Sequence, residues 1–261
     1  MRKRAAYAGA LTGLALLLAS CASTGAAQAP VPVASAWRPA LFVDGYGATG
    51  LGPTPTDSTL DDATQKMLAT LGILQSDLPS TLTAALATDG TSLTVASMSY
   101  CNGTFASEDA RVARRRTVVK PETAVPTATS EVVYYRTVAD ASTALSELRG
   151  VMQECPEHRT ASDSTTTLAL DTVSSDKVDL SGLVPSDRRV VLSVNVTPAG
   201  TESSAYRIVR VWQQRGRVLV GILYSGAGTD FTDADRTNLH LLTAAVAARL
   251  DALPSSFTGT G

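Results

Sequence analysis

The chain has 261 residues, a formal net charge of −2 and a hydrophobic fraction of 44%. A charge so close to zero gives no reason to expect binding to nucleic acid or to an acidic membrane surface by bulk electrostatics. The apolar content is enough for a packed core, and the length allows one large domain or two small ones. Only 2 histidines are present, which argues against a metal site built from several of them.

The first 20 residues have the pattern of an export signal. Arg2, Lys3 and Arg4 form a basic start, and a mostly apolar stretch follows from Ala5 to Leu18. This stretch is shorter than the roughly 20 residues that a membrane-spanning helix needs. We therefore interpret residues 1–20 as a secretory signal peptide.

The signal ends in Leu18-Ala19-Ser20-Cys21, which resembles a bacterial lipobox. In such signals the cysteine thiol receives a diacylglyceryl group, the peptide is cut before the cysteine, and fatty acids such as palmitate anchor the new N-terminus. Two acyl chains give stable attachment where one would be marginal. The sequence therefore predicts lipid attachment at Cys21 and a lipoprotein on the extracytoplasmic side of the cell membrane. The alternative is an ordinary signal peptide with an incidental cysteine.

Two cysteines remain, Cys101 and Cys155. An even pair in an exported chain is most simply one disulfide. If a disulfide acts by reducing the entropy of the unfolded chain, closing a loop of roughly 53 residues stabilises the folded state by about 4 kcal/mol. A reactive thiol pair is the weaker alternative, because Cys-x-x-Cys spacing is lacking.

Residues 21–56 are rich in Ala, Gly, Pro, Ser and Thr and predict a flexible tether after the lipidated N-terminus. Its middle, Trp37–Val43, is more apolar than a linker needs. This segment either docks on the domain or is a short unstructured patch. We expect a folded domain over 57–254 and a disordered tail over 255–261.

The first half of the domain predicts one helix and three strands. Helical spacing runs from a cap at Asp57 or Ser58 to a stop at Gly72. A strand is expected in "TSLTVASMSY" (91–100), running into Cys101, and two more are expected in "RRRTVVK" (114–120) and "SEVVYYRTV" (130–138).

The second half begins with a helix over 140–155, capped by Asp140. Four strand-like runs follow, the last two joined by a turn at 214–216. A final helix starts at Thr232, where Asp235 completes a pattern close to a capping box. These elements predict an α+β fold, with a mainly antiparallel sheet packed against flanking helices and one disulfide.

Catalytic motifs are not evident. The glycine-rich stretch 224–230 joins a strand to a helix and is best interpreted as a connection. His158 and His240 are expected to be surface or packing residues. We therefore expect a protein that is not an enzyme and that needs no metal or cofactor.

Basic residues are concentrated after Cys101. Arg114 and Arg116, with Arg111, Arg115 and Lys120, are candidates for holding an anionic ligand such as a phospholipid headgroup or a wall polymer. The favoured alternative is a solvated edge strand, where charge blocks unwanted pairing.

Aromatic residues on the expected strands form a second candidate set. They either line an apolar cleft with polar tips or belong to the sheet core, and the core interpretation is favoured. The candidates are Tyr134, Tyr206, Trp212 and Tyr224.

The arrangement from about Asp57 to Leu253 resembles the PknH-like extracellular sensor domain. The resemblance rests on "ILQSDLPS" after a first helix, a strand ending in Cys101, the segment "VVYYRTVADASTALSELRGVMQEC", and a long final helix after a hairpin. It implies an antiparallel sheet flanked by helices, with a cleft for an envelope ligand. The best-studied type of member carries two disulfides, whereas this chain can form only the Cys101–Cys155 pair.

These observations lead to a functional expectation. The chain is expected to bind or sense a cell-envelope ligand (a lipid, a wall fragment or a small molecule) through a cleft in its domain. Because the sequence has neither a kinase domain nor a transmembrane helix leading to one, a sensed signal would pass to a partner. The alternative is a structural protein that displays the domain to an envelope protein partner.

Overall fold

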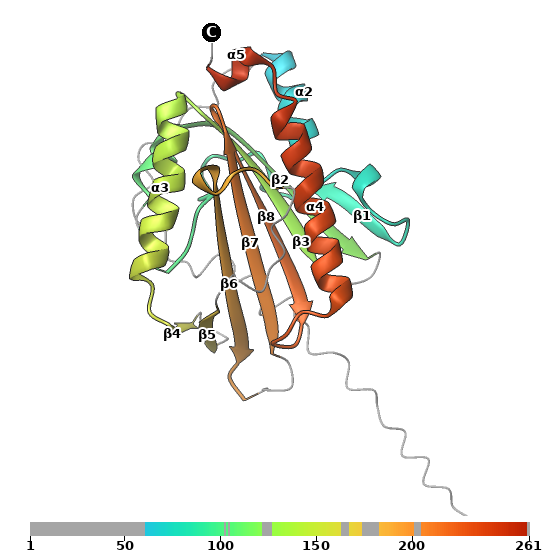
Figure 1. The fold of residues 1–261 in the computed structure, drawn as a ribbon, viewed down its shortest axis with the longest axis vertical. Helices are drawn as coiled ribbons and strands as arrows, with labels where there is room; N and C mark the ends of the chain where they lie inside the picture. Colours follow the sequence, from blue (N-terminus) through green and yellow to red (C-terminus); the bar gives the residue numbers. More distant parts are fainter. Residues whose placement is uncertain are drawn as a thin grey trace, which may run out of the picture. The chain divides into compact units, whose positions relative to one another are not determined.

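The strands form one eight-stranded sheet in the order β1-β2-β3-β8-β7-β6-β5-β4, with antiparallel neighbours throughout (Figure 1). The computed structural model describes residues 61–101, 103, 105–121, 127–162, 167–173, 183–200 and 205–259. They all belong to one compact unit, Pro32–Gly261. The α+β prediction is confirmed. The strands are β1 (Leu82–Leu86), β2 (Arg111–Pro121), β3 (Ala128–Tyr135), β4 (His158–Ser162), β5 (Thr167–Val173), β6 (Arg189–Pro198), β7 (Tyr206–Arg215) and β8 (Val218–Ala227).

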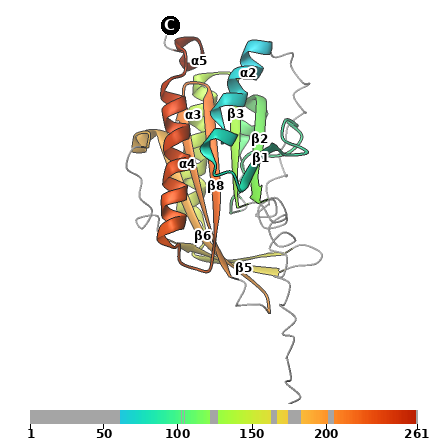
Figure 2. The same ribbon diagram turned by 90° about the vertical axis from the view of Figure 1, so that its right-hand side faces the viewer.

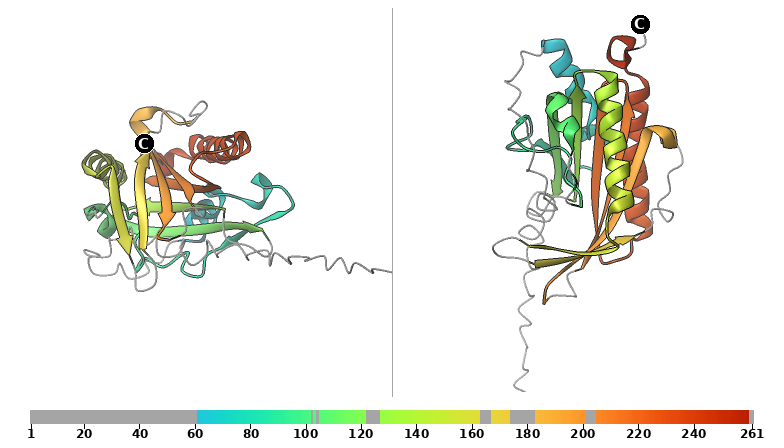
Figure 3. Two further views of the ribbon diagram at one scale, coloured as in Figure 1. Left: turned by 90° about the horizontal axis from the view of Figure 1, so that it is seen from below. Right: turned by 90° about the vertical axis from the view of Figure 1, so that its left-hand side faces the viewer.

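Helices cover both faces of this sheet, as the side view in Figure 2 and the right-hand view in Figure 3 show. The α-helices are α2 (Asp62–Leu71), α3 (Val138–Glu154), α4 (Asp233–Asp251) and α5 (Ser255–Thr258). Short 3-10 turns are η1 (Gln75–Asp77), η2 (Ala106–Ala110) and η4 (Ser186–Arg188).

Successive side chains of a strand point to opposite faces, so each central strand contributes to two cores. In β3, Val133 and Tyr135 pack with helix α3, whereas Val132 and Tyr134 pack with α2 and α4. We call these surfaces of the sheet the α3 face and the α4 face. Both faces of the sheet are buried. A strand that is buried on both faces has apolar side chains at successive positions, which explains the nearly continuous apolar runs of β7 and β8.

Helix α3 begins earlier than the sequence predicted. Its N-cap is Thr137, whose hydroxyl accepts from the Asp140 N–H at 3.1 Å, and the Asp140 carboxylate in turn accepts from the Thr137 N–H at 2.9 Å. The expected cap residue Asp140 is therefore the third residue of a capping box, one turn inside the helix. The apolar stripe of this helix faces the sheet and contains Ala141, Ala144, Leu145 and Leu148.

Helix α4 begins as predicted, with Thr232 and Asp235 forming a capping box. Helix α2 is capped by Asp61 and ends at Gly72, as expected for its C-terminus. The predicted caps Asp57 and Ser58 lie outside the described residues. The buried stripe of α4 packs on β7 and β8 and contains Leu239, Leu242, Val246 and Leu250.

The strand predicted over 91–100 is wrong. These residues form a loop, although their apolar alternation fits a strand. The reason is that charged side chains bind the backbone groups that a strand partner would otherwise satisfy. The contacts are Arg111 Nη2 to Leu93 O at 2.9 Å, Arg111 Nη1 to Val95 O at 2.8 Å, and the N–H groups of Ser97 and Met98 to Glu108 at 2.9 and 2.8 Å.

The sheet ends at two short strands that sequence reasoning missed, β1 and β4. Part of the open edge of β1 is covered by a side chain: Gln75 Nε2 donates to Leu82 O, and the Ala84 N–H donates to Gln75 Oε1, both at 2.9 Å. An amide that pairs with both groups imitates a neighbouring strand, which is one way to discourage edge-to-edge association.

The expected tail from residue 255 is corrected in part, because helix α5 occupies Ser255–Thr258. Its Phe257 ring lies 6.1 Å from the ring of Tyr134. The β7–β8 turn lies close beneath it: Gly216 has φ +55°, and an added Cβ would come within 2.3 Å of Thr258. Residues 260 and 261 lie outside the described part.

The signal peptide 1–20, the lipid site Cys21 and the tether 21–56 with its apolar segment Trp37–Val43 also lie outside the described residues. In the part of the chain that is described, no helix combines the length and the apolarity needed to cross a membrane.

Candidate functional site

The structure brings together four of the six candidate ligand residues on the α3 face of the sheet and separates the other two. Tyr206 and Trp212 belong to the core under α3. Arg114 pairs with Val133 and Arg116 with Glu131 in the β2–β3 register, so they share this face. The remaining candidates, Tyr134 and Tyr224, lie on the α4 face.

The interpretation of the arginines as a solvated edge strand is wrong. Strand β1 pairs with β2 only over Thr117–Pro121, and beside Arg116 the backbone groups of Ala87 and Gly90 take its place. Arg114 is only 2% exposed, and its Nε lies 2.8 Å from Glu131 Oε1. Arg116 Nη2 lies 2.8 Å from the other carboxylate oxygen of Glu131. Two arginines therefore share one buried carboxylate.

This sharing fixes the charge of Glu131. Burial opposes ionisation of the carboxyl, but the nearby Arg116 and Arg114 guanidinium groups outweigh it and lower its pKa to about 2. The carboxylate is thus ionised at any physiological pH, and it neutralises part of the positive charge that the sequence suggested for an anionic ligand.

A second buried ion pair joins Arg111 to Glu108 at 3.0 Å. Burial raises the pKa of Glu108 to about 7, although Arg111 and the backbone N–H groups of Ser97 and Met98 favour the charged form. The two buried glutamates therefore differ: one carboxylate is held by two arginines, and the other by one arginine and two amides.

The arginines also hold the loop of residues 89–101, which we call the 89–101 loop. Arg114 Nη1 donates to the carbonyls of Asp89 at 3.1 Å and Ser92 at 2.8 Å. Its Nη2 is buried and has no hydrogen-bond partner among the described residues. The Arg114 guanidinium therefore binds Glu131 through Nε and positions the loop over the sheet through Nη1.

Arg116 and Trp212, 96 positions apart, fall in one row across the sheet. The strand registers place Arg116, Glu131, Gly221 and Trp212 side by side on β2, β3, β8 and β7. The indole lies over Gly221, because a Cβ there would be 2.6 Å from the Trp212 ring. The glycine therefore makes room for the aromatic ring beside the charged cluster.

Trp212 and Tyr206 are 4% and 3% exposed. Within the described residues, neither the Trp212 Nε1 nor the Tyr206 hydroxyl has a hydrogen-bond partner, and the same is true of the Ser99 hydroxyl in the 89–101 loop. Burial raises the pKa of Tyr206 above its usual range, so its hydroxyl is neutral and can donate. Six positions along one strand separate the two aromatic residues by about 20 Å, with Arg210 between them.

On the α4 face, the two predicted aromatic residues have clear packing roles. The Arg217 guanidinium lies 4.3 Å over the Tyr134 ring, on which Phe257 also packs. The Tyr224 hydroxyl donates to Asp235 at 3.0 Å, which ties the end of β8 to the start of α4. The sheet-core interpretation describes these two residues well.

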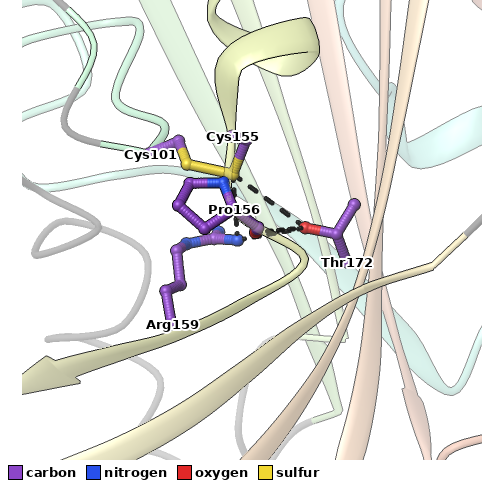
Figure 4. Close-up of a disulfide and its surroundings, with 5 residues drawn as sticks. All are labelled: Cys101, Cys155, Pro156, Arg159 and Thr172. Atoms are coloured by element: carbon purple, nitrogen blue, oxygen red, sulfur yellow. Dashed lines mark hydrogen bonds between the residues drawn. A yellow bond between two sulfur atoms is a disulfide. The ribbon is translucent and has the colours of Figure 1, made fainter.

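The predicted disulfide is confirmed. Cys101 and Cys155 are bonded, with their Cα atoms 5.7 Å apart, and the bond links the 89–101 loop to the C-terminus of α3 (Figure 4). Arg159 lies beside the bond: its Nη1 is 3.3 Å from Cys155 Sγ, and its guanidinium carbon is 4.9 Å from the centre of the Tyr100 ring.

The two histidines lie on different elements of the fold. His158 is 76% exposed, and its Nδ1 lies 2.8 Å from Asp171, whose hydrogen bond and charge raise the pKa of the histidine. His240 belongs to α4. Across the described ranges, no group of three or more His, Cys, Asp or Glu side chains is placed to hold a metal ion.

Sequence reasoning missed Glu108, Glu131, Gly221 and Arg159. Two signals were present: Glu108 precedes Arg111 by three positions, and Glu131 is a charge at the start of the apolar run "VVYY". The contact of Gly221 with Trp212 depends on strand pairing and had no local signal. Arg159 lies only four positions from Cys155, but its stacking on Tyr100 depends on the fold.

The domain belongs to the α+β class, because it has an eight-stranded antiparallel sheet with helices on both faces, together with one disulfide. The chain is similar to the solved extracellular domain of PknH from Mycobacterium tuberculosis, with 12% identity over 72% of this chain and 96% of that chain, and a TM-score of 0.46. It is also similar to a putative uncharacterized protein (Rv0999 ortholog) from Mycobacterium smegmatis, with 10% identity over 74% of this chain and 100% of that chain, and a TM-score of 0.33. No protein-family profile matches the chain. No curated protein matches it either.

Proposed function

We propose that the protein is a membrane-anchored extracytoplasmic lipoprotein that binds a cell-envelope ligand on the α3 face of its sheet. The location is supported by the signal-like start, the lipobox ending in Cys21 and the disulfide, which is typical of oxidising compartments. The ligand class is a lipid, a wall fragment or a small molecule with hydrogen-bonding groups.

The observation that carries the binding proposal is the set of unpartnered buried polar groups on this face. Among the described residues, the Tyr206 hydroxyl and the Trp212 indole N–H are buried without a partner. Leaving such a group unsatisfied costs about 1–3 kcal/mol, so these residues reduce the stability of the free protein. A ligand that accepts from both groups would recover this free energy.

The spacing of these groups favours an elongated ligand. Both donors lie on β7, about 20 Å apart, with Ile208 of the apolar core and the cationic Arg210 between them. An apolar chain with an acceptor at each end matches this pattern.

The test is a binding screen on the full-length chain, with thermal shift and isothermal calorimetry against phospholipids and wall fragments. Tyr206→Phe should leave the unfolding temperature of the free protein unchanged or raised, because it removes an unpartnered hydroxyl. The same variant should weaken binding of a ligand found in the screen by about tenfold.

Tyr134→Phe on the α4 face is the matched control and should bind normally. If no compound in the screen shifts the unfolding temperature, or if Tyr206→Phe binds as tightly as the natural chain, the proposal is overturned.

The anchor has a separate test. Cys21→Ala should abolish incorporation of labelled palmitate and move the protein from the membrane to the soluble fraction, while the domain keeps its unfolding temperature. An unchanged mass and membrane partition in this variant would exclude lipid attachment at Cys21.

The alternative of an envelope protein partner is distinguished by crosslinking in cells. A crosslinked protein that is lost in a β1 or α4 surface variant and retained in Tyr206→Phe would favour the partner over the ligand.

A further inference from the structure

The two sulfurs of the disulfide have different surroundings. The Arg159 Nη1 donates to Cys155 Sγ at 3.3 Å, and the Thr172 hydroxyl lies 3.9 Å from the same sulfur (Figure 4). Within the described residues, no hydrogen bond or ion pair reaches Cys101 Sγ. Both cysteines are half-buried at the margin of the α3-face core.

We propose that Cys101–Cys155 is a thiol-exchange site with a fixed direction, in which a dithiol reductant of the extracytoplasmic space attacks Cys101 and Cys155 leaves. The attacking thiolate forms a bond to Cys101 Sγ, the bond between the two cysteines breaks, and its electron pair passes to Cys155 Sγ. The second thiol of the reductant then displaces Cys101. Two electrons are transferred, the reductant ends as a disulfide, and both cysteines of the chain end reduced.

The charge beside Cys155 sets this direction, because the sulfur with the lower thiol pKa leaves faster. A guanidinium at hydrogen-bond distance stabilises the thiolate, as basic neighbours do for reactive cysteines in general. Arg159 is kept in place by the Tyr100 ring and by Thr172, whose hydroxyl it also contacts at 3.3 Å.

Other charges near Cys155 act against the thiolate but are weaker. Cys155 follows the last residue of α3, so the negative end of the helix dipole opposes a second negative charge there. Glu154 and Glu157 are exposed, and water screens their charge. On β4 and β5, His158 and Asp171 pair with each other. Arg159 is the closest of these groups and is partly buried, so its contribution is the largest.

Exchange at this site would remove one of the links that hold the 89–101 loop; the contacts with Arg111, Arg114 and Glu108 remain. The disulfide joins this loop to α3, and its residues Met98 and Tyr100 form part of the core beneath that helix. Cys101 itself has φ +54°, a conformation that residues other than glycine adopt infrequently. Reduction would therefore loosen one specific cover of the α3 face. This inference does not depend on ligand binding at that face.

The experiment maps the mixed disulfide. The oxidised full-length chain is treated with reduced glutathione at pH 8, quenched with iodoacetamide and digested for peptide mass mapping. The expected result is glutathione on Cys101 and the carbamidomethyl group on Cys155. Glutathione on Cys155 would overturn the proposal.

Alkylation of the fully reduced chain as a function of pH gives a second readout. Cys155 should be alkylated at lower pH than Cys101, because the Arg159 guanidinium lies beside its sulfur. Arg159→Gln should raise the pKa of Cys155 and slow the attack by glutathione about tenfold, as expected when the leaving thiol becomes more basic. Arg159→Lys should restore most of the rate.

Lys66→Gln, an exposed charge on α2, is the matched control and should react like the natural chain. Equal rates for Arg159→Gln and the natural chain would overturn the proposal. If Arg159→Gln does not fold, the site of the glutathione adduct and the pH profile of the natural chain decide the question.

Discussion

The two faces of the sheet satisfy their buried polar groups differently. On the α4 face, two polar side chains are satisfied in part: Gln213 Nε2 donates to Thr243 O at 3.2 Å, and Arg249 binds Asp77 at 2.8 and 2.9 Å. Gln213 Oε1 and Arg249 Nε have no hydrogen-bond partner among the described residues. On the α3 face, Tyr206 and Trp212 bury polar groups that are unpartnered among the described residues. The difference is one of degree: Tyr206 and Trp212 each leave their one side-chain polar atom unpartnered, whereas Gln213 and Arg249 each make at least one hydrogen bond. Natural proteins break packing rules chiefly where function requires it.

The difference extends to how each face is covered. The α4 face is covered by a continuous helix whose apolar stripe packs on β7 and β8. The α3 face is covered by α3 and by an irregular loop that a disulfide and buried ion pairs hold in place. Breaking one of these links loosens the loop, whereas no single link holds a helix that packs along its length.

Removing the disulfide tests this contrast with the largest expected effect. Replacing Cys101 and Cys155 by serine should lower the free energy of unfolding by about 4 kcal/mol, because the unfolded chain regains the freedom of a long loop. Urea denaturation measures the change. Hydrogen exchange should quicken in the 89–101 loop and α3 more than in α4. Cys21→Ser is the control, and equal loss of protection on both faces would contradict the contrast.

The raised pKa of Glu108 predicts that the free energy of unfolding depends on pH. Its pKa is raised to about 7 from an ordinary 4.5, so in that window the folded state holds a proton that the unfolded chain has released. Stability should therefore fall as pH rises from 4.5 to 7, by about 3 kcal/mol at most. Glu108→Gln should remove this slope in chemical denaturation measured across the window.

Glu131, the second buried glutamate, affects the stability of the protein in a different pH range. The pKa of Glu131 is lowered to about 2, so its stabilising contribution is lost only as pH falls below 4.5. Exposed Glu157→Gln is the charge-matched control for Glu108→Gln. A Glu108→Gln chain that keeps the full slope between pH 4.5 and 7 would assign the slope to other groups.

The packing of Trp212 against Gly221 predicts a change in stability of intermediate size. Gly221→Ala should lower the free energy of unfolding by about 2 kcal/mol, because the new Cβ overlaps the indole and must displace it. Trp212 fluorescence should change as the ring moves. Gly150→Ala in α3 is the control: no atom lies within 4 Å of its added Cβ, so stability should be unchanged or higher. Similar results for the two variants would refute the packing described for Trp212.

A pair of tyrosine variants gives the smallest and most direct comparison of the faces. Tyr224→Phe removes hydrogen bonds to Asp235 and Asn238 and should destabilise the protein by about 1 kcal/mol. Tyr206→Phe removes none among the described residues and should be neutral or stabilising. Thermal unfolding of both variants decides. A loss of stability in Tyr206→Phe would mean that its hydroxyl is satisfied and that the faces do not differ in this respect.

Local pattern was enough to predict some elements. The capping box of Thr232 and Asp235 and the turn between β7 and β8 involve residues within a few positions of each other. The turn lies at 216–217, slightly later than the predicted 214–216, because β7 continues to Arg215. The disulfide could be predicted because only two cysteines remained once Cys21 was assigned to the membrane. Strands β2, β3, β5, β6, β7 and β8 were expected from their β-branched and aromatic content.

The failures share a physical cause, since each depended on distant residues. The 91–100 segment alternates like a strand, but Glu108 and Arg111 bind its backbone instead. In the sequence, Arg114 and Arg116 resemble part of a solvated patch. In the fold, both bind Glu131 of the neighbouring strand β3 in a buried cluster. The contact of Trp212 with Gly221 and its place beside Glu131 require the pairings of β7 with β8 and of β8 with β3, which a single sequence does not state.

The pairing of β3 with β8 has a consequence for how the chain folds. It joins Val132 to Val220 and Tyr134 to Val218 across more than 80 positions, and it is the junction between the β1–β3 half of the sheet and the rest. Contacts so distant in sequence form slowly, because a long loop must close before they contribute. While the chain folds, the edge of β3 would stay open until β8 is available. A chain truncated before Val218 should therefore expose that edge and be prone to aggregation and degradation.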